Sequence, residues 1–482
     1  MAVLPQVMPR RLLVNSAAIA GGEAASRLAT FLMAVVIAHH FGATALGQYG
    51  FALAAASILL LVPDFGLHLY LVRELSANRR VLGSVFWNVH WLKVILLTVM
   101  LALGGIFFRW GTSDAGQRVL FGILAGRVIL QTFSQASMAV FKACEEMHYV
   151  AWQQVLNTAL VAAWVVGALA LGAGLPMVVL GFVAGQAAET CLGWRIVHTR
   201  FSPGPPAPWN TRAIAAIVAA SFPIGVTAIL QATNLRVDIL VLSRFATGRV
   251  LGQFQAAAWF PVGSFLAASL LMTVLFPKIS RLLRAKSRQG GEYLHGLIKN
   301  SVLVAGLAAI LTWFAAPQLL VWVFGRETAL ASGALRILAP MLPLVFLNTI
   351  LFYVFVAAGC RSVYFGTLAF GVGAGGALSF FLTALGGPAG CAFADVAREG
   401  LISAACIFFL VREERTRATG AALAKAFSAA TVLTVLGYVL TGPIAWNERW
   451  PACWLLLLLL GTIAGMGLPN RREWALLTND NL

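Results

Sequence analysis

Long apolar segments recur along the whole chain, and each is long enough to cross a membrane as a helix. A bilayer core of about 30 Å needs about 20 apolar helical residues. The segments that qualify, with approximate bounds, are 13–39, 46–70, 82–108, 118–141, 148–172, 176–197, 213–243, 250–277, 295–323, 329–358, 363–386, 390–411, 421–444 and 452–468. We therefore expect an all-α polytopic membrane protein with about 14 transmembrane helices.

Composition excludes the soluble classes of protein. Hydrophobic residues make up 60% of the 482 residues and charged residues only 11%, and a soluble chain of this length cannot bury so much apolar surface. The net charge of +17 reflects Lys and Arg in cytoplasmic loops rather than a nucleic-acid partner. Placing both termini in the cytoplasm puts most of these bases on the inner side. The six cysteines are scattered without paired spacing, which indicates neither disulfides nor metal ligands.

A repeated motif indicates an internal duplication. Leu46-Gly47-Gln48-Tyr49 opens an apolar run that ends at Arg73, and Leu251-Gly252-Gln253-Phe254 opens another that ends at Lys278. The two runs align at one offset, and repeats of this size are typical of transporters built from two halves. A proline-rich stretch, 199–211, is a natural connector. The domains expected are a six-helix lobe at 1–198, this linker, a six-helix lobe at 212–412, and two further helices with a tail at 413–482.

Charged residues inside the predicted spans need a reason, because each costs about 2.5–3.5 kcal/mol to insert. Arg127, Gln131 and Gln135 are four residues apart and share one helical face. When the two halves of the sequence are aligned through the repeated motif, arginines of the first half fall within one helical turn of Arg236 and Arg336. The substrate-binding candidates are Arg27, Arg127, Gln131, Gln135, Gln231, Asn234, Arg236 and Arg336. The candidates for ion coupling or gating are Glu23, Asp64, Glu189, Asp238 and Asp395.

Motifs for enzymatic chemistry are absent or out of context. The glycine-rich run from Gly371 to Gly376 lies inside an apolar span, without the strand and acid of a dinucleotide site. The sequence contains no P-loop, HExxH or GxSxG motif. We expect no catalytic residues, no cofactor and no metal, and therefore no enzyme.

Several short motifs resemble a known family. They are Phe41-Gly42, Leu46-Gly47-Gln48-Tyr49, Asp64-Phe65-Gly66-Leu67 with Arg73, Val237-Asp238-Ile239-Leu240-Val241-Leu242-Ser243-Arg244-Phe245, and Leu251-Gly252-Gln253-Phe254 with Ala257. The chain in these stretches is similar to the polysaccharide-biosynthesis flippases, oligosaccharide-lipid exporters of the multidrug/oligosaccharidyl-lipid/polysaccharide superfamily. The resemblance implies two six-helix lobes in a V that flip a polyprenyl-diphosphate-linked glycan by alternating access. It also implies the bacterial inner membrane, and a role in making a surface polysaccharide such as O-antigen or exopolysaccharide.

The candidate residues suit such a substrate. Arginine forks match a diphosphate, and the amide side chains match sugar hydroxyls. The expected partners are the lipid-linked oligosaccharide, membrane lipids, a polysaccharide polymerase and glycosyltransferases, and no nucleic acid. Three alternatives stay open: a cation-coupled multidrug exporter of the same superfamily, a flippase for the peptidoglycan lipid precursor, and a non-transporting membrane scaffold for glycan enzymes.

Overall fold

The computed structural model describes residues 10–110, 114–206, 208–284, 288–412, 421, 423–428 and 450–466. Within these ranges every regular element is a helix. Contacts divide the chain into two compact units, each described by itself below. The first unit contains Met1–Phe41 and Gln48–Arg236, and the second contains Gly42–Gly47 and Val237–Leu482.

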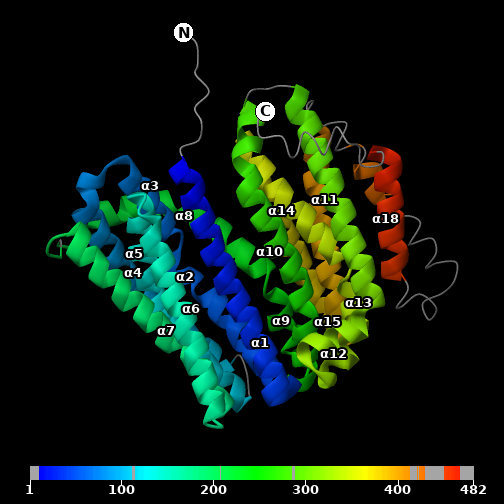
Figure 1. Cartoon of the computed structure of the whole chain (residues 1–482), viewed down its shortest axis with the longest axis horizontal. Coiled ribbons are helices and arrows are strands. Elements are labelled where there is room, and N and C mark those ends of the chain that lie inside the picture. Colours follow the sequence, from blue (N-terminus) through cyan, green and yellow to red (C-terminus); the bar gives the residue numbers. More distant parts are fainter. Residues whose placement is uncertain are drawn as a thin grey trace. The chain divides into compact units, whose positions relative to one another are not determined.

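The first unit is a bundle of long helices joined by short turns (Figure 1). Its elements are α1 (Arg10–Leu59), α2 (Leu61–Asp64), α3 (Leu67–Ala77), η1 (Arg79–Val81), α4 (Leu82–Trp110), α5 (Ala115–Ala143), α6 (Met147–Ala170), α7 (Leu175–Ile196), the π-helical η2 (Val197–Phe201) and α8 (Thr211–Asn234). The α1 residues Gly42–Gly47 pack with the second unit.

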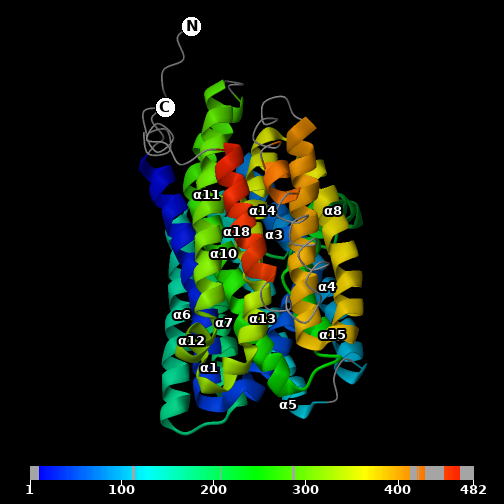
Figure 2. The same ribbon diagram turned by 90° about the vertical axis from the view of Figure 1, so that its right-hand side faces the viewer.

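The second unit is also a helical bundle, with α18 lying along α11 (Figure 2). Its elements are α9 (Val237–Leu242), α10 (Gly248–Arg284), α11 (Arg288–Phe314), α12 (Ala316–Phe324), η3 (Arg326–Ala331), α13 (Ser332–Leu338), α14 (Met341–Ala358), α15 (Arg361–Arg412) and α18 (Trp450–Met466). Three of them, α11, α14 and α18, share one apolar cluster that includes Leu342, Trp454 and Leu458.

The described residues contain 10 helices that are long and apolar enough to cross a membrane, and the predicted count of 14 is not confirmed. The span Val363–Arg412 holds two of the predicted segments, and the span Ser26–Ala77 holds the segment predicted at 46–70 and the latter part of the one predicted at 13–39. The segment predicted at 421–444 lies largely outside the described residues. The last predicted segment is a shorter apolar helix, Pro451–Ala464. The protein is therefore an all-helical, multi-pass membrane protein.

Helix breaks differ from the predicted segments at several places. The segment predicted at 46–70 is interrupted at Phe65 and Gly66, which have φ of 32° and 76°. A Cβ on Gly66 would lie 2.9 Å from the backbone nitrogen of Gly225 on α8, so this turn needs glycine for both its conformation and its packing. The segment predicted at 213–243 divides between α8 and α9, and the segment at 329–358 divides at Pro340.

Two other breaks fall at glycines inside long helices. Gly42 kinks α1 with φ 78° and ψ −179°, and Gly387 kinks α15 with φ 56° and ψ −135°. By contrast, α10 continues through Pro261 without an interruption. The lost backbone hydrogen bond of a proline does not by itself end a helix whose neighbours hold it.

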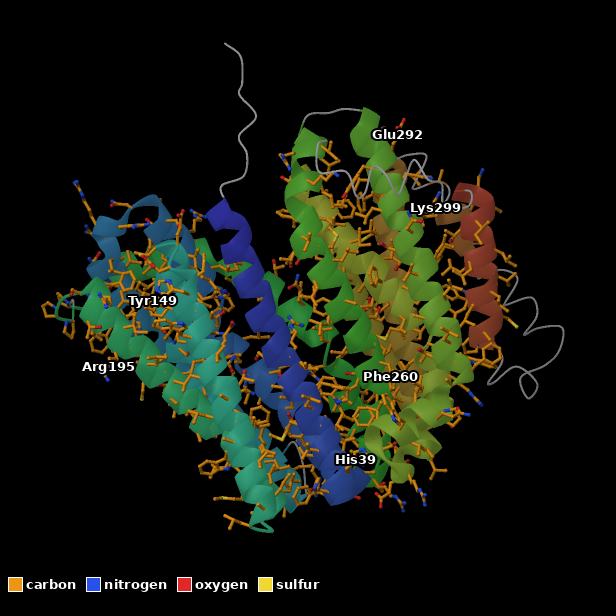
Figure 3. All side chains as sticks on the ribbon, in the orientation of Figure 1. His39, Tyr149, Arg195, Phe260, Glu292 and Lys299 are labelled. Atoms are coloured by element: carbon orange, nitrogen blue, oxygen red, sulfur yellow. The ribbon has the colours of Figure 1, made fainter. Side chains whose placement is uncertain are left out.

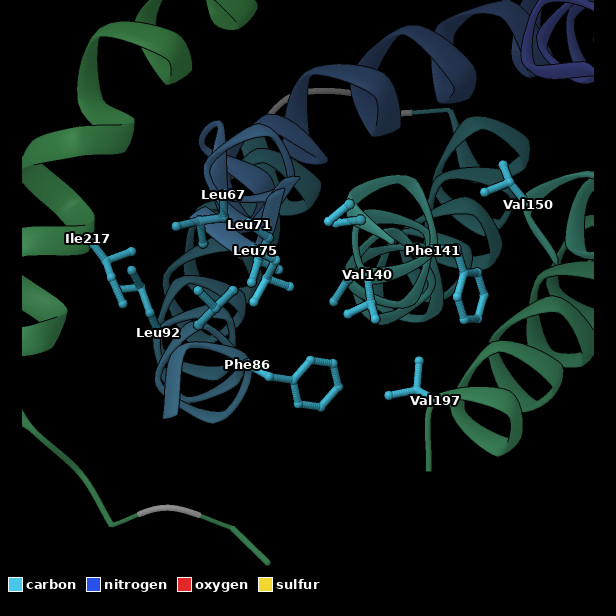
Figure 4. Packing of buried hydrophobic residues seen from close by; sticks show 14 of the residues in the cluster. Leu67, Leu71, Leu75, Phe86, Leu92, Val140, Phe141, Val150, Val197 and Ile217 are labelled. Carbon is cyan, nitrogen blue, oxygen red and sulfur yellow. The ribbon is translucent and has the colours of Figure 1, made fainter. Parts of the chain in front are cut away.

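The core of the first unit forms around one face of α3. Leu67, Leu71 and Leu75 follow each other at four-residue spacing and are almost completely buried. They pack with Phe86 of α4, Phe141 of α5 and other members of the cluster (Figure 4). This periodic face holds α3 against α4, α5 and α8 although the helix has only 11 residues.

The repeated Leu-Gly-Gln motifs meet in the second unit. A Cβ on Gly252 would overlap the carbonyl oxygen of Ala43, and a Cβ on Gly47 would overlap that of Gly248. The backbone nitrogen of Ala43 also donates to Glu327 Oε2 over 2.9 Å. Small residues allow such close backbone approach between membrane helices. The two equivalent glycines of the repeat thus lie at one helix contact.

The predicted lobes at 1–198 and 212–412, with their linker at 199–211, concern an internal repeat and remain a prediction. In the structure α8 packs against α2, α3 and α4. The boundary between the two units therefore lies after Arg236, one helix beyond that linker.

Replacing Gly252 with Ala tests the close helix contact. The added methyl group has to displace the backbone at Ala43, and overpacking of this kind costs about 1–3 kcal/mol or more. Gly263→Ala on the same helix is the matched control, because a Cβ there meets nothing within 4 Å. We expect Gly252→Ala to lower the thermal unfolding midpoint in detergent and Gly263→Ala to leave it unchanged or raise it. Equal midpoints for the two variants would contradict the contact.

Candidate functional site

The first unit contains a polar cavity among its membrane-spanning helices. Its volume is about 260 Å³, and α1, α3, α5, α6 and α7 all contribute to its wall. The lining residues are Ser26, Ala29, Thr30, His68, Arg127, Gln131, Gln135, Met138, Lys142, Gln154, Asn157, Thr158, Val161, Phe182, Gln186 and Glu189. Polar side chains at membrane depth are costly unless they face such a cavity or one another.

One face of α5 supplies the largest share of the polar wall. Arg127, Gln131 and Gln135 line the cavity at successive turns, and Lys142 continues the same face. The helix is capped by Asp114, whose carboxylate accepts hydrogen bonds from the backbone nitrogens of Gly116 and Gln117. Three residues that the sequence placed on one face are therefore brought together by the structure.

Arg127 stacks on an aromatic wall. Its guanidinium carbon lies 4.8 Å from the ring centroid of Phe182 on α7, a favourable cation–π distance. The Phe182 ring stacks in turn on the buried ring of Tyr49, with centroids 6.4 Å apart. Among the described residues, no group accepts a hydrogen bond from the buried Nε of Arg127. This guanidinium is thus fixed in place and still has a donor to offer.

Glu189 lines the same cavity as a hydrogen-bonded acidic side chain. The side chain is only 5% exposed, and its carboxylate accepts hydrogen bonds from the Ser134 hydroxyl and the Asn157 amide. Gln153 supports it by donating to the Glu189 carbonyl over 3.0 Å. Glu189 also lies within electrostatic reach of Arg127. A carboxylate held in this way balances part of the positive charge in the cavity.

Asp64 lies beside the cavity in a small buried group of charges. His68 Nδ1 is 3.1 Å from Asp64 Oδ2, and Lys93 Nζ is 3.9 Å from Asp64 Oδ1. Lys93 is completely buried and donates to the carbonyl oxygen of Thr132 on α5 over 2.6 Å. Asp64 is the last residue of α2, directly before the break at Phe65 and Gly66, so these contacts hold that break against α4 and α5.

A second charged cluster lies in the second unit. Arg398 and Asp395, both 1% exposed, form an ion pair of 2.7 Å on α15. Asp238 of α9 and Glu399 are close enough to affect the same pair electrostatically, and Glu399 accepts a hydrogen bond of 2.8 Å from Asn348. The structure therefore brings together Asp238 and Asp395, two of the predicted coupling residues.

The other predicted residues lie outside the cavity lining. Arg27 on α1 is exposed, and Gln231 and Asn234 lie in the last turn of α8. Arg236 lies in the break before α9, and both it and Arg127 are within electrostatic reach of Tyr49. Arg336 stacks on Trp313 in the second unit, 5.4 Å from the ring centroid. The side chain of Glu23 lies outside the described residues.

Sequence reasoning missed several residues of this site. Lys93, His68 and Lys142 were not singled out, and neither were Ser134 and Asn157, which hold Glu189. The spacing of Gln153 and Asn157, one helical turn apart, was an available signal. In the part of the chain that the structure describes, no three His, Cys, Asp or Glu side chains are grouped to hold a metal ion.

Comparisons with known proteins agree with this architecture. The model of a family described as "Polysaccharide biosynthesis protein" matches residues 12–283, and no curated protein sequence matches the chain. A structure of the lipid II flippase MurJ in an inward closed conformation superposes with a TM-score of 0.65 at 15% identity, over 94% of this chain and 98% of that chain.

Two further structures share the fold. An inward-facing multidrug resistance MATE family transporter of the MOP superfamily has a TM-score of 0.63 at 14% identity, over 82% of this chain and 95% of that one. A MOP superfamily transporter from Pyrococcus furiosus has a TM-score of 0.57 at 14% identity, over 85% and 96%. These likenesses establish the fold. Because the family model covers more than half of the sequence, the chain belongs to the polysaccharide biosynthesis protein family.

Proposed function

We propose that this protein moves a lipid-linked oligosaccharide across the bacterial cytoplasmic membrane by alternating access, for assembly of a surface polysaccharide. The observation that carries the proposal is the polar cavity with the stacked Arg127 inside the membrane-spanning helices of a polysaccharide biosynthesis family member. A purely structural scaffold has no use for such a cavity. Movement of an intact substrate also needs no catalytic residue, cofactor or metal.

The cavity has the chemistry that a diphosphate and a sugar require. Arg127 offers a desolvated guanidinium donor to an anion. Gln131 and Gln135 lie one and two turns further along α5, where their amides can pair with sugar hydroxyls. Phe182 lines the same cavity and holds the Arg127 guanidinium against its ring. An isoprenoid tail has no polar group to satisfy and can remain in the lipid.

Charge separates this proposal from a drug exporter. The cavity lining holds Arg127 and Lys142 against the single carboxylate of Glu189, so its balance favours an anion over a cationic drug. Arg27 and Arg236, which lie outside the lining, are proposed to meet the diphosphate on its way to or from the cavity. A polysaccharide polymerase and glycosyltransferases are the proposed partners, with O-antigen or exopolysaccharide as the product.

The proposal is tested with purified protein in vesicles that contain a fluorescent lipid-linked oligosaccharide in one leaflet. Loss of label from that leaflet reports flipping. The peptidoglycan lipid precursor and a cationic drug are assayed in parallel vesicles. Flipping of the oligosaccharide lipid supports the proposal. Movement of the peptidoglycan precursor or of the drug alone assigns the protein to one of the alternative functions instead.

Arg127→Gln is expected to slow flipping about 10- to 100-fold, because a hydrogen bond to a charged group contributes about 1.5–3 kcal/mol. The measurement is the initial flipping rate at equal amounts of inserted protein. Arg195→Gln is the matched control in the same unit, since Arg195 is an exposed residue near the end of α7 (Figure 3). Full activity in the double variant Arg27→Ala with Arg127→Ala, when it still inserts normally, contradicts the assigned anion site.

Membrane potential is expected to speed export without any nucleotide. An outward-moving diphosphate gains about 2.3 kcal/mol per elementary charge per 100 mV when the inside is negative, so two charges gain about 4.6 kcal/mol. Vesicles with an imposed potassium-diffusion potential but no pH or sodium gradient should therefore flip faster than vesicles at zero potential. Transport that ignores the potential and follows an imposed pH gradient would instead indicate proton coupling.

A further inference from the structure

A second cavity lies in the second unit, at the end where α10 begins. Its volume is about 310 Å³, and its wall comes from the first turns of α10, from η3 and α13, and from the kink of α15. Val250, Phe254, Ile337 and Pro388 belong to its apolar lining, and Gln253 is the one polar side chain among the described lining residues. The function proposed above makes no use of this cavity.

This apolar cavity is open to the surroundings of the protein. Leu330 lines it and is 78% exposed, and the candidate membrane span Gly248–Phe276 reaches it with its first turns. Water finds almost no polar partner there, and an empty cavity loses the dispersion contacts of its lining atoms. A lipid chain from the bilayer is therefore the natural filling. Because lipid chains are as apolar as this wall, the chain alone gives little selectivity.

Two exposed arginines lie in the segments that form the rim of this cavity. Arg249 is one turn before Gln253 and shares its face of α10. Gln253 donates from Nε2 to the carbonyl oxygen of Glu327 over 3.0 Å, and Arg326 directly precedes Glu327 at the start of η3. The hydrogen bond that joins two walls of the cavity therefore also holds together the two segments that carry these arginines.

The positive charge at this rim is not neutralised by ion pairs. Within the part of the chain that the structure describes, Arg249 and Arg326 form no ion pair, and neither does Arg244 in the turn before α10. The carboxylate of Glu327 accepts a hydrogen bond of 2.9 Å from the backbone nitrogen of Ala43. In the orientation expected from the sequence these arginines lie on the outer side, where basic residues are sparse. The positive-inside bias therefore does not account for them.

We propose that this cavity binds an anionic membrane phospholipid, with one chain in the cavity and the phosphate at Arg249 and Arg326. Guanidinium groups match the geometry of a phosphate and form strong, charge-assisted hydrogen bonds with it. A zwitterionic lipid brings the same chains but no net negative charge, so the arginines select the anionic one. The inference does not rest on the proposed function, because it concerns the other unit and a lipid that is not transported.

Photolabelling of the full-length protein in vesicles tests the charge selectivity. Phosphatidylglycerol and phosphatidylcholine with the same diazirine-labelled chain are compared, and the labelled peptides are mapped by mass spectrometry. A basic side chain near an anionic headgroup contributes about 1 kcal/mol, about fivefold, so two arginines predict about 25-fold more labelling of the cavity wall by phosphatidylglycerol. In Arg249→Gln with Arg326→Gln the two lipids should label this wall equally. Arg281→Gln, an exposed arginine near the other end of α10, is the matched control and should keep the preference.

Gly333→Leu tests the cavity separately from its charge. Gly333 lines the cavity, and a Cβ there meets no atom within 4 Å, so a larger side chain can fill the space without a clash at its first atom. Both lipids should then lose their labelling of α10 and α15 at the cavity wall, although both arginines remain. Gly263→Leu is the matched control on α10, because its Cβ also meets nothing and it lies outside the lining.

Three results would overturn the inference. Equal labelling of the cavity wall by the two lipids in the unmodified protein removes the selectivity for an anion. Absence of labelling there, or labelling that survives Gly333→Leu, shows that no lipid chain enters the cavity. Stronger competition by an unlabelled polyprenyl-diphosphate lipid than by unlabelled phosphatidylglycerol makes the occupant a transported lipid instead of a phospholipid. The flipping assay concerns the cavity of the first unit, so either proposal can fail without the other.

Discussion

Charge buried in the membrane has to be balanced nearby, and this requirement shapes both units. Each isolated charge at the centre of a bilayer costs about 2.5–3.5 kcal/mol on insertion scales. Arg127 lies near Glu189, Lys93 lies near Asp64, and Arg398 pairs with Asp395. These residues come from different helices in the first unit and from neighbouring turns of α15 in the second. Charge balance therefore decides which helix faces turn toward each other in the first unit.

Much of this arrangement could be predicted from sequence. Apolar length indicated the spans, and four-residue spacing put Arg127, Gln131 and Gln135 on one face. The helix breaks were harder to predict. Positions 42 and 66 require glycine because of the atoms that pack against them, and the sequence does not show these neighbours. The burial of Lys93 is not evident from the sequence, because a single lysine in an apolar helix often extends to the membrane interface. Its burial depends on Asp64 and on Thr132, which lie on other helices.

The two Leu-Gly-Gln motifs each make a contact through their glutamine side chain, and the two units differ in how they hold a buried arginine. Gln48 donates to Asp114 before α5, and Gln253 donates to the carbonyl oxygen of Glu327 in η3. Each glutamine thus ties its motif to a connecting segment of its own unit. By contrast, Arg127 lines a cavity, whereas Arg398 is paired with Asp395 and packs so closely on Gly375 that a Cβ there would lie 2.3 Å from its Cγ. Only the first of these guanidinium groups is placed to receive a ligand.

The Lys93 contacts also have a consequence for biogenesis. Membrane helices leave the ribosome in sequence order, so Asp64 reaches the bilayer before Lys93, and Thr132 arrives after both. The helix with Lys93 can therefore enter the bilayer beside Asp64, which has already been inserted. The high apolar content of α4 offsets the rest of the free energy of inserting the lysine. The carbonyl oxygen of Thr132 completes the contact only when α5 has been synthesised. The order of the residues along the chain thus matches the order in which the charge is neutralised.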